Sequence, residues 1–149
     1  MRELPSTIQI RLASKDDLPA LVAAGDMLFD YPVKVGRSHE FFSDPRLHLA
    51  IAMDQGKIVG MVSGVHYVHP DKDPELFINE ASVLDSYQNK GIGQNLIKYI
   101  IGFARKELDC KTAWVTTEKD NIAARKAYRA AGGKEDENIV FFEFDTSQS

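Results

Sequence analysis

The sequence predicts an α/β fold built on a mixed β-sheet, and three observations lead to it. Several short runs are apolar or alternate apolar with polar residues, as β-strands do. Apolar residues also recur at helical spacing, most clearly between residues 92 and 108. A glycine-containing loop separates that helix from the apolar run before it, which is the order of a phosphate-binding site. With 149 residues, we expect a single domain over 1–149 with a sizeable core.

The first third of the chain predicts a strand followed by a helix. Residues 7–12 alternate and form the expected first strand. Ser14 is a suitable N-cap with acidic residues after it, so a helix is expected to begin there and to continue to Leu28. Pro32 disfavours helix in the residue before it and ends that helix. Residues 33–45 are predicted to be a loop or a short helix.

The middle of the chain predicts three strands joined by turns. Residues 47–53 and 58–68 are the second and third strands, and the turn at 54–57 makes them a hairpin. Residues 70–74 begin and end with proline and predict a rigid polar turn. Residues 75–84 are the expected fourth strand.

The last third predicts two helices and two strands. Gly91 to about residue 108 is the main helix, and residues 113–117 are the fifth strand. Residues 121–131 form a second helix that two glycines stop. The run Ile-Val-Phe-Phe-Glu-Phe at 139–144 is predicted to be a last strand.

The loop before the main helix, Gln88-Asn-Lys-Gly91-Ile-Gly93, has the properties of an anion site. First-turn N–H groups and the helix dipole together attract phosphate. The two glycines allow a tight turn and place no Cβ in a ligand's way, and Lys90 adds a positive charge. The loop is not a dinucleotide fingerprint, because Leu96 holds the third glycine position, nor a Walker A loop, because no Gly-Lys-Ser/Thr follows.

This Gln-x-x-Gly-x-Gly pattern resembles the diphosphate-binding signature of the GNAT superfamily of acyl-CoA-dependent N-acetyltransferases. In that family it reads Gln/Arg-x-x-Gly-x-Gly/Ala, and Gln88, Gly91 and Gly93 fill its fixed places. Further along, Asn121-Ile-Ala-Ala-Arg-Lys-Ala-Tyr128 resembles the family's second motif, with its Asn and its Tyr at the family spacing. Two motifs in the family order carry much more weight than either one.

The resemblance extends from residue 8 to residue 145 and implies a fold, a co-substrate and a set of contacts. The implied fold is a mixed, mostly antiparallel sheet of six to seven strands flanked by helices. Strands four and five splay apart, and the pantetheine of the co-substrate inserts between them like an extra strand. The co-substrate is acetyl-CoA, and no metal is expected. The implied cofactor-binding residues are Ser82, Val83, Gln88, Asn89, Lys90, Gly91, Ile92, Gly93, Gln94, Asn121, Ala124 and Tyr128.

Acetyl transfer to an amine by direct attack, through a tetrahedral intermediate, makes three chemical demands. A lysine-like amine has a pKa of about 10.4 and is almost fully protonated at pH 7, so it must lose a proton to a base. The thioester oxygen gains charge in the intermediate and needs an N–H donor. The thiolate leaves more easily when an acid gives it a proton.

Three places in the sequence are candidates for these roles. Glu80, at the end of the fourth strand, is the candidate base, acting directly or through a water. Alternatively, the Glu80 carboxylate faces solvent on the strand or belongs to an ion pair, and has no catalytic role. The oxyanion donor is expected to be a backbone N–H near Ser82 or Val83. The resemblance gives Tyr128 the acid role, although a core tyrosine is also consistent with its position. Asn121 would hold a pantetheine amide, and it is also a suitable helix N-cap.

The acceptor is predicted from a second resemblance. Residues 78–83 and 134–145 look like their counterparts in type I aminoglycoside 3-N-acetyltransferases, and in such enzymes residues corresponding to 33–45 help to form the acceptor pocket. This implies a small cationic amine, possibly an aminoglycoside, in an acidic pocket lined by Glu80, Glu143 and Asp145. The sequence departs from that branch at Glu80, where Asp is usual. Two alternatives remain: an acyl-CoA-binding regulatory module without turnover, and a protein or peptide N-acetyltransferase.

Composition and short sequence features indicate which partners and which cell compartment to expect. The net charge of −4 disfavours a nucleic-acid partner. No apolar run is long enough to span a membrane, and residues 1–6 do not look like a signal peptide. The single cysteine, Cys110, suits the reducing cytoplasm. His66 and His69 lie at odd spacing on a strand and make a poor metal pair. The apolar edge at 139–144 predicts a homodimer through the last strand.

Overall fold

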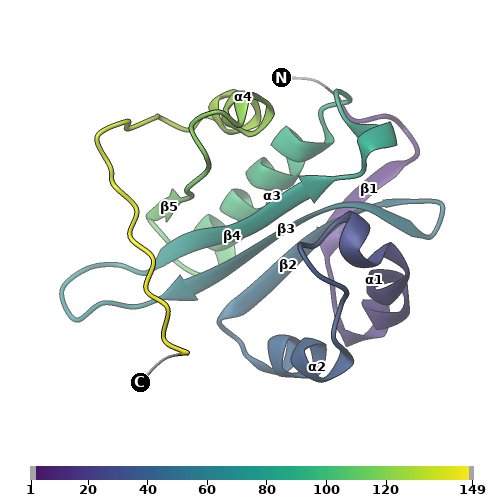
Figure 1. Cartoon of the computed structure of the whole chain (residues 1–149), viewed down its shortest axis with the longest axis horizontal. Coiled ribbons are helices and arrows are strands. Elements are labelled where there is room, and N and C mark those ends of the chain that lie inside the picture. Colours follow the sequence, from purple (N-terminus) through teal and green to yellow (C-terminus); the bar gives the residue numbers. More distant parts are fainter. Residues whose placement is uncertain (1–2, 148–149) are drawn as a thin grey trace.

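The fold is organised around one five-stranded sheet, which the computed structural model describes within residues 3–147 (Figure 1). The strands follow each other in chain order across the sheet. Neighbouring strands are antiparallel except β4 and β5, which are parallel and therefore need a crossover helix between them. The strands are β1 (Ile8–Leu12), β2 (Leu47–Asp54), β3 (Lys57–Tyr67), β4 (Glu75–Val83) and β5 (Thr112–Trp114).

Helices cover both faces of this sheet. The crossover helix α3 (Ile92–Glu107) packs on one face against β2, β3 and β4, while α1 (Leu18–Ala24) and α2 (Val35–Ser43) lie on the other (Figure 1). The remaining helix, α4 (Ile122–Ala130), packs beside α3. The short 3₁₀ turns are η1 (Lys15–Asp17), η2 (Gly25–Met27) and η3 (Asp85–Tyr87). Within the described part of the chain, no helix is long and apolar enough to cross a membrane.

The core lies between the central strands and α3. Two glycines of β3 allow the close approach of its neighbours: a Cβ at Gly60 would lie 3.1 Å from Leu96 Cδ1, and one at Gly64 would lie 3.0 Å from Leu76 Cδ1. The largest fully buried side chains are those of Ile51, Ile58, Val59, Met61, Val62, Leu76, Ile92, Leu96 and Ile100. Their burial explains the continuous apolar run of β3, which is covered on both faces.

Two sequence predictions about the strands were wrong. Residues 139–144 form no strand, so the described sheet has five strands rather than six to seven. High β-propensity reflects a good fit to a partner strand, and this segment has none in the structure. The fifth strand is also shorter than the predicted 113–117. The segment 33–45, predicted as a loop or short helix, contains α2.

The splay between strands four and five is visible in their register. β5 pairs only with Glu75–Phe77, at the start of β4. Residues 78–83 of β4 therefore continue without a β5 partner on that side. The open stretch of β4 leads directly into the loop before α3, where the sequence predicts the anion site.

Candidate active site

A cavity of about 540 Å³ lies where β4 and β5 separate. The second half of β4, the loop before α3, the start of α3 and one face of α4 enclose it. Of the twelve residues predicted to contact the cofactor, ten line this cavity: Ser82, Val83, Gln88, Asn89, Gly91, Gly93, Gln94, Asn121, Ala124 and Tyr128. The other two are Lys90, which is exposed, and Ile92, whose side chain is 1% exposed in the core. Only the backbone of Ile92 is therefore available to a ligand.

The loop before α3 turns through two left-handed residues. Asn89 has a φ of 61° and Gly91 has a φ of 82°, and Asn and Gly are the residue types that adopt this conformation most readily. Gly91 is also the N-cap of α3, so the unpaired N–H groups of the first turn begin beside the cavity. At Gly93, an added Cβ would meet only Val83 Cγ2, at 3.8 Å. The packing of the protein does not require this glycine, whereas a ligand approaching the backbone would.

Two glutamine side chains in this region have different roles. Gln88 Nε2 donates to the carbonyl of Val83 and to Asp85 Oδ1, both at 3.2 Å, and so ties the loop to the end of β4. Gln94 Nε2 is buried and has no hydrogen-bond partner among the described residues. A buried donor without a partner costs about 1–3 kcal/mol. Together with the helix N-terminus, this donor fits a ligand with anionic or carbonyl oxygens, as coenzyme A has.

A second cavity, of about 430 Å³, lies on the other side of β4, between the sheet and the segment from η2 to α2. Its apolar lining comes mainly from five side chains: Leu21, Phe29, Phe41, Phe42 and Leu49. The rings of Phe41 and Phe42 meet edge to face, with centroids 5.4 Å apart. Glu80 and Asn79 reach this cavity from β4, and Ser63 from β3.

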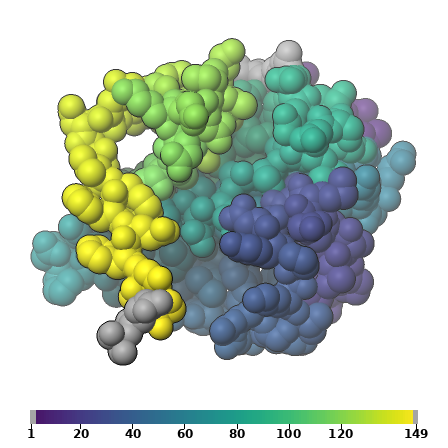
Figure 2. Space-filling view, viewed as in Figure 1, coloured from purple at the N-terminus to yellow at the C-terminus, as the bar shows by residue number. Residues whose placement is uncertain are grey.

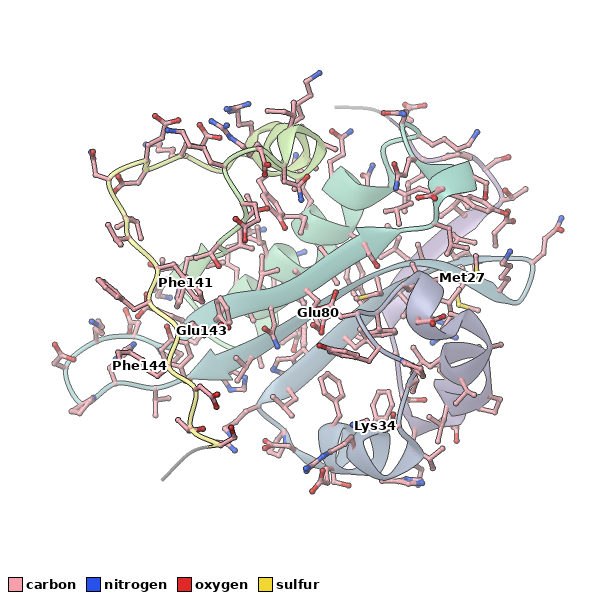
Figure 3. The ribbon with its side chains drawn as sticks, viewed as in Figure 1. Met27, Lys34, Glu80, Phe141, Glu143 and Phe144 are labelled. Carbon is pink, nitrogen blue, oxygen red and sulfur yellow. The ribbon has the colours of Figure 1, made fainter. Side chains whose placement is uncertain are left out.

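A β-bulge directs both Asn79 and Glu80 toward the second cavity. Ser63 pairs with Glu80, but the next residue, Gly64, pairs with Ile78, so Asn79 is the extra residue on β4. In a regular strand, consecutive side chains point to opposite faces. A bulge interrupts this alternation, and bulges are frequent beside active sites. Glu80 occupies the centre of the sheet in Figure 3.

The environment of Glu80 favours its neutral form. Burial is the main effect that raises the pKa of this carboxyl group, and the negative charge of Asp30 raises it further. A carboxylate with a raised pKa is a stronger base, so it takes a proton from an ammonium group more readily than an ordinary glutamate does. Asp30 also lines the second cavity, so two carboxylates are available there for a cationic group.

Comparison with known proteins identifies the fold and the family. Residues 16–132 match the family model described as Acetyltransferase (GNAT) family. The chain belongs to the GNAT acetyltransferase family. It is therefore an acetyl-CoA-dependent N-acetyltransferase, as the two motifs predicted.

Individual relatives of this GNAT enzyme are aminoglycoside acetyltransferases. An aminoglycoside N(6')-acetyltransferase type 1 of Salmonella typhimurium is 28% identical over 101 residues, which cover 64% of this chain and 69% of the relative. A crystal structure of the aminoglycoside acetyltransferase meta-AAC0020, from an uncultured soil metagenomic sample and in complex with sisomicin, has a TM-score of 0.84 at 20% identity, covering 96% of this chain and 99% of that one. AAC(6')-Iy in complex with CoA has a TM-score of 0.79 at 22% identity, covering 97% and 99%.

These relatives correct one detail of the sequence analysis. The resemblance to the 3-N branch was wrong, because the curated relatives are N(6')-acetyltransferases. Short acidic and aromatic stretches suggested the 3-N branch. In the structure these stretches are the second half of β4 and an exposed C-terminal segment, and neither feature specifies which amine of a sugar reacts.

Around the first cavity, the partner or the environment of three predicted side chains limits the contacts that each can make. Ser82 Oγ donates to the carbonyl of Leu28 at 2.5 Å, so its hydroxyl hydrogen is already used and is not available to a ligand. Asn121 Oδ1 accepts from the N–H of Ala124 at 3.1 Å and caps α4. Burial raises the pKa of the Tyr128 hydroxyl, which keeps this group protonated over the physiological range.

Two predicted acceptor residues lie elsewhere. Glu143 and Asp145 belong to the exposed C-terminal segment, on which Figure 3 labels Glu143, and neither residue lines either cavity. The second cavity is instead lined by Asp30, Lys34 and Arg37, which the sequence analysis did not single out. For Lys34 and Arg37, the only signal was the expectation that residues 33–45 would help to form the acceptor pocket. Asp30 lies before that segment, and no sequence signal pointed to it.

Proposed function

We propose that this GNAT enzyme transfers an acetyl group from acetyl-CoA to the primary amine of a small cationic molecule. One observation supports this most strongly: the two cavities meet at a single stretch of β4. Asn79 and Glu80 line the acceptor cavity, while Ala81, Ser82 and Val83 line the cofactor cavity. An amine and a thioester held in the two cavities would thus approach each other across adjacent residues of one strand.

On the cofactor side, the proposed contacts are mostly backbone groups. The loop from Gln88 to Gln94 would hold the diphosphate through its N–H groups and the helix dipole, and Gln94 Nε2 would provide an additional donor. Residues 82 and 83 would pair with the pantetheine through their main chains. This division is consistent with the structure, in which the Ser82 side chain already has a partner.

In the proposed reaction, the proton on the ammonium group passes to Glu80, directly or through a water. The neutral nitrogen forms a bond to the thioester carbonyl carbon, and a backbone N–H near Ser82 or Val83 stabilises the charge on the oxygen. The carbon–sulfur bond then breaks, and Tyr128 gives its hydroxyl proton to the leaving thiolate. The attacking nitrogen loses its second proton as the amide forms, and that proton returns the Tyr128 oxygen to its hydroxyl form through solvent. The raised pKa of Glu80 and the protonated state of Tyr128 are consistent with these directions of proton transfer.

The acceptor class follows from the charges of the second cavity and from the names of the relatives. Asp30 and Glu80 suit an ammonium group, and an aminoglycoside is the first candidate because of the related acetyltransferases. Lys34 and Arg37 line the same cavity, and Arg37 is already paired with Glu40 at 2.8 Å. A contribution of Glu143 and Asp145 to this pocket stays a prediction.

The decisive assay measures thiol release from acetyl-CoA across aminoglycosides, polyamines, amino acids and peptides. We expect release with at least one small amine, and a loss of about 10²–10⁴ in kcat/KM in Glu80→Gln, the usual range for a general base. The variant should also lose the ascending limb of the pH–rate profile. Full turnover with an unchanged limb would show that Glu80 is not the base. Binding of CoA without release for any amine would favour the regulatory module.

The acid role has its own test with a matched control. Tyr128→Phe should lower kcat at least tenfold while leaving acetyl-CoA binding nearly intact. Tyr99→Phe, on the outer part of α3 and 37% exposed, should behave like the wild type. An unchanged kcat in Tyr128→Phe would remove this residue from the mechanism.

We also propose that the enzyme works in the cytoplasm and as a homodimer. The buried, free thiol of Cys110 is consistent with a reducing compartment. Cell fractionation checks the first proposal, and a measurement of mass in solution checks the second.

A further inference from the structure

The acceptor cavity, of about 430 Å³, holds charged groups of both signs that do not pair with one another. Asp30 and Glu80 contribute two carboxylates to its lining, and Lys34 contributes an ammonium group. Among the described residues, none of these three charged groups has an ion pair or a hydrogen bond. Because binding sites place opposite charges against each other, these groups specify the charges of a ligand.

Arg37 and Lys34 differ in their partners, although both line the cavity. Arg37 Nη1 donates to Glu40 Oε2 at 2.8 Å, so this guanidinium group already has a carboxylate partner within α2. Lys34 is the N-cap residue of α2, and its carbonyl oxygen accepts from the N–H of Ser38 at 2.9 Å and from Ser38 Oγ at 2.8 Å. These contacts fix the backbone of Lys34, and its ammonium group stays available to a ligand.

Glu80 and Lys34 lie on different walls of the cavity. Glu80 is on β4, in the sheet, whereas Lys34 lies directly before α2, in the layer that covers this face of the sheet (Figure 3). In Figure 2, the blue segment with α1 and α2 lies beside the teal surface of the central strands. The charge of Asp30 acts on Glu80 and raises the pKa of its carboxyl group. The two carboxylates therefore form one charged region, and Lys34, which pairs with neither, marks another.

The remaining lining of the cavity is largely apolar and aromatic. Phe29, Phe41 and Phe42 line it together with Leu21 and Leu49. Apolar walls of this kind favour a ligand whose own apolar surface removes them from water. A ligand that matches the whole cavity therefore has an ammonium group, an apolar body and an anionic group.

We propose that the preferred acceptor is an amino carboxylate, a small molecule with an apolar body that carries a carboxylate besides the reacting amine. Its ammonium group lies at Asp30 and Glu80, and its carboxylate pairs with Lys34. This inference rests on the proposed acetyl transfer and narrows its acceptor. The names of the relatives point to an aminoglycoside, which has several amines and no carboxylate. Such an acceptor leaves Lys34 without a partner, so we expect it to be the weaker substrate.

The test uses two acceptors that differ in one charge. In para-(aminomethyl)benzoate, an amine and a carboxylate are attached to one aromatic ring, and in para-(aminomethyl)benzamide a neutral amide replaces the carboxylate. Thiol release from acetyl-CoA measures kcat/KM for each. In the wild type, we expect the value for the benzoate to be higher by at least about fivefold, a preference that one partly exposed charge pair can supply. High salt should reduce this preference, because ions screen the charge of an exposed lysine.

Lys34→Gln identifies the residue responsible. This variant should bring the ratio of the two kcat/KM values close to one by lowering the value for the benzoate. The lost contact is remote from the reacting atoms, so the change should appear in KM rather than in kcat. Lys98→Gln is the matched control, because Lys98 is also exposed but belongs to α3, on the other face of the sheet. It should keep the wild-type ratio.

Three results would overturn the inference. The first is a kcat/KM for the benzamide that equals or exceeds that for the benzoate in the wild type. The second is an unchanged ratio in Lys34→Gln, and the third is a higher kcat/KM for sisomicin than for the benzoate. In each case an amine is acetylated, so the proposed function stands. If no amine causes thiol release, the proposed function itself fails, and the inference fails with it.

Discussion

Replacing Gly93 by valine separates folding from cofactor binding. Gly93 is the second residue of α3, where valine is about 0.3–0.5 kcal/mol more favourable than glycine by helix propensity. The nearest atom to an added Cβ is Val83 Cγ2, at an ordinary 3.8 Å, so the protein has room for the first atom of the side chain. The free energy of unfolding of Gly93→Val should therefore stay within about 1 kcal/mol of the wild type.

The same substitution should weaken coenzyme A binding. The valine side chain projects into the cofactor cavity and prevents an anion from reaching the backbone N–H groups. Hydrogen bonds to charged groups contribute about 1.5–3 kcal/mol, so the loss of one contact corresponds to roughly a 10- to 150-fold higher Kd. Isothermal titration with CoA measures this change, and thermal unfolding measures stability.

Gly102→Val is the matched control on the same helix. A Cβ at Gly102 meets no atom within 4 Å, and Gly102 lines neither cavity. The free energy of unfolding of Gly102→Val should also stay close to that of the wild type, as in Gly93→Val. The affinity of Gly102→Val for CoA should equal that of the wild type. Wild-type affinity in Gly93→Val, or an equal loss in Gly102→Val, would refute the assignment of the diphosphate to this loop.

Three further predictions concern pH and packing. Asp30→Asn should shift the ascending limb of kcat/KM to lower pH, because the charge of Asp30 raises the pKa of Glu80; an unmoved limb would exclude this coupling. Burial, followed by the charge of His66, lowers the pKa of His48 from 6.5 to about 4. Between these two pH values, the His48 ring is protonated in the unfolded chain and neutral in the folded protein. Stability should fall between pH 6.5 and 4 by about 1–2 kcal/mol, allowing for the half-buried ring, and His48→Gln should flatten this dependence in urea titrations. Gly64→Ala should destabilise by about 1–3 kcal/mol in the same assay, and more than Gly60→Ala, because its Cβ would lie 3.0 Å from the carbonyl oxygen of Phe77, a backbone atom that cannot move aside.

Much of the fold was predictable because its signals are local. The capping box of Ser14 and the helical period of 92–108 each depend on a few neighbouring residues, and the structure has a 3₁₀ turn at the first and α3 at the second. The segment 139–144 was predicted to be a strand for the same local reason. Its pairing depends on an edge elsewhere in space, and propensity has no information about that edge.

The two sides of the site differed in how far the sequence could predict them. The cofactor side lies in two short motifs, since a diphosphate is held by backbone N–H groups that only particular turns present. The acceptor side is assembled from distant segments. The bulge at Asn79 follows from the register of two strands, and Asp30 reaches the cavity only because α1 and η2 pack on that face. Neither feature leaves a pattern in consecutive residues.

The bulge at Asn79 makes the proposed chemistry possible on a single strand. Regular alternation from Glu80 would turn Asn79 to the opposite face, toward the core beneath α3. With one extra residue, Asn79 and Glu80 both face the acceptor, and the next three residues of β4 line the cofactor cavity. Only one or two residues then lie between the proposed base, Glu80, and the proposed oxyanion donor, the N–H of Ser82 or Val83. Because β4 is also hydrogen-bonded to β3 along this stretch, the distance between these two groups is set by the sheet rather than by a mobile loop.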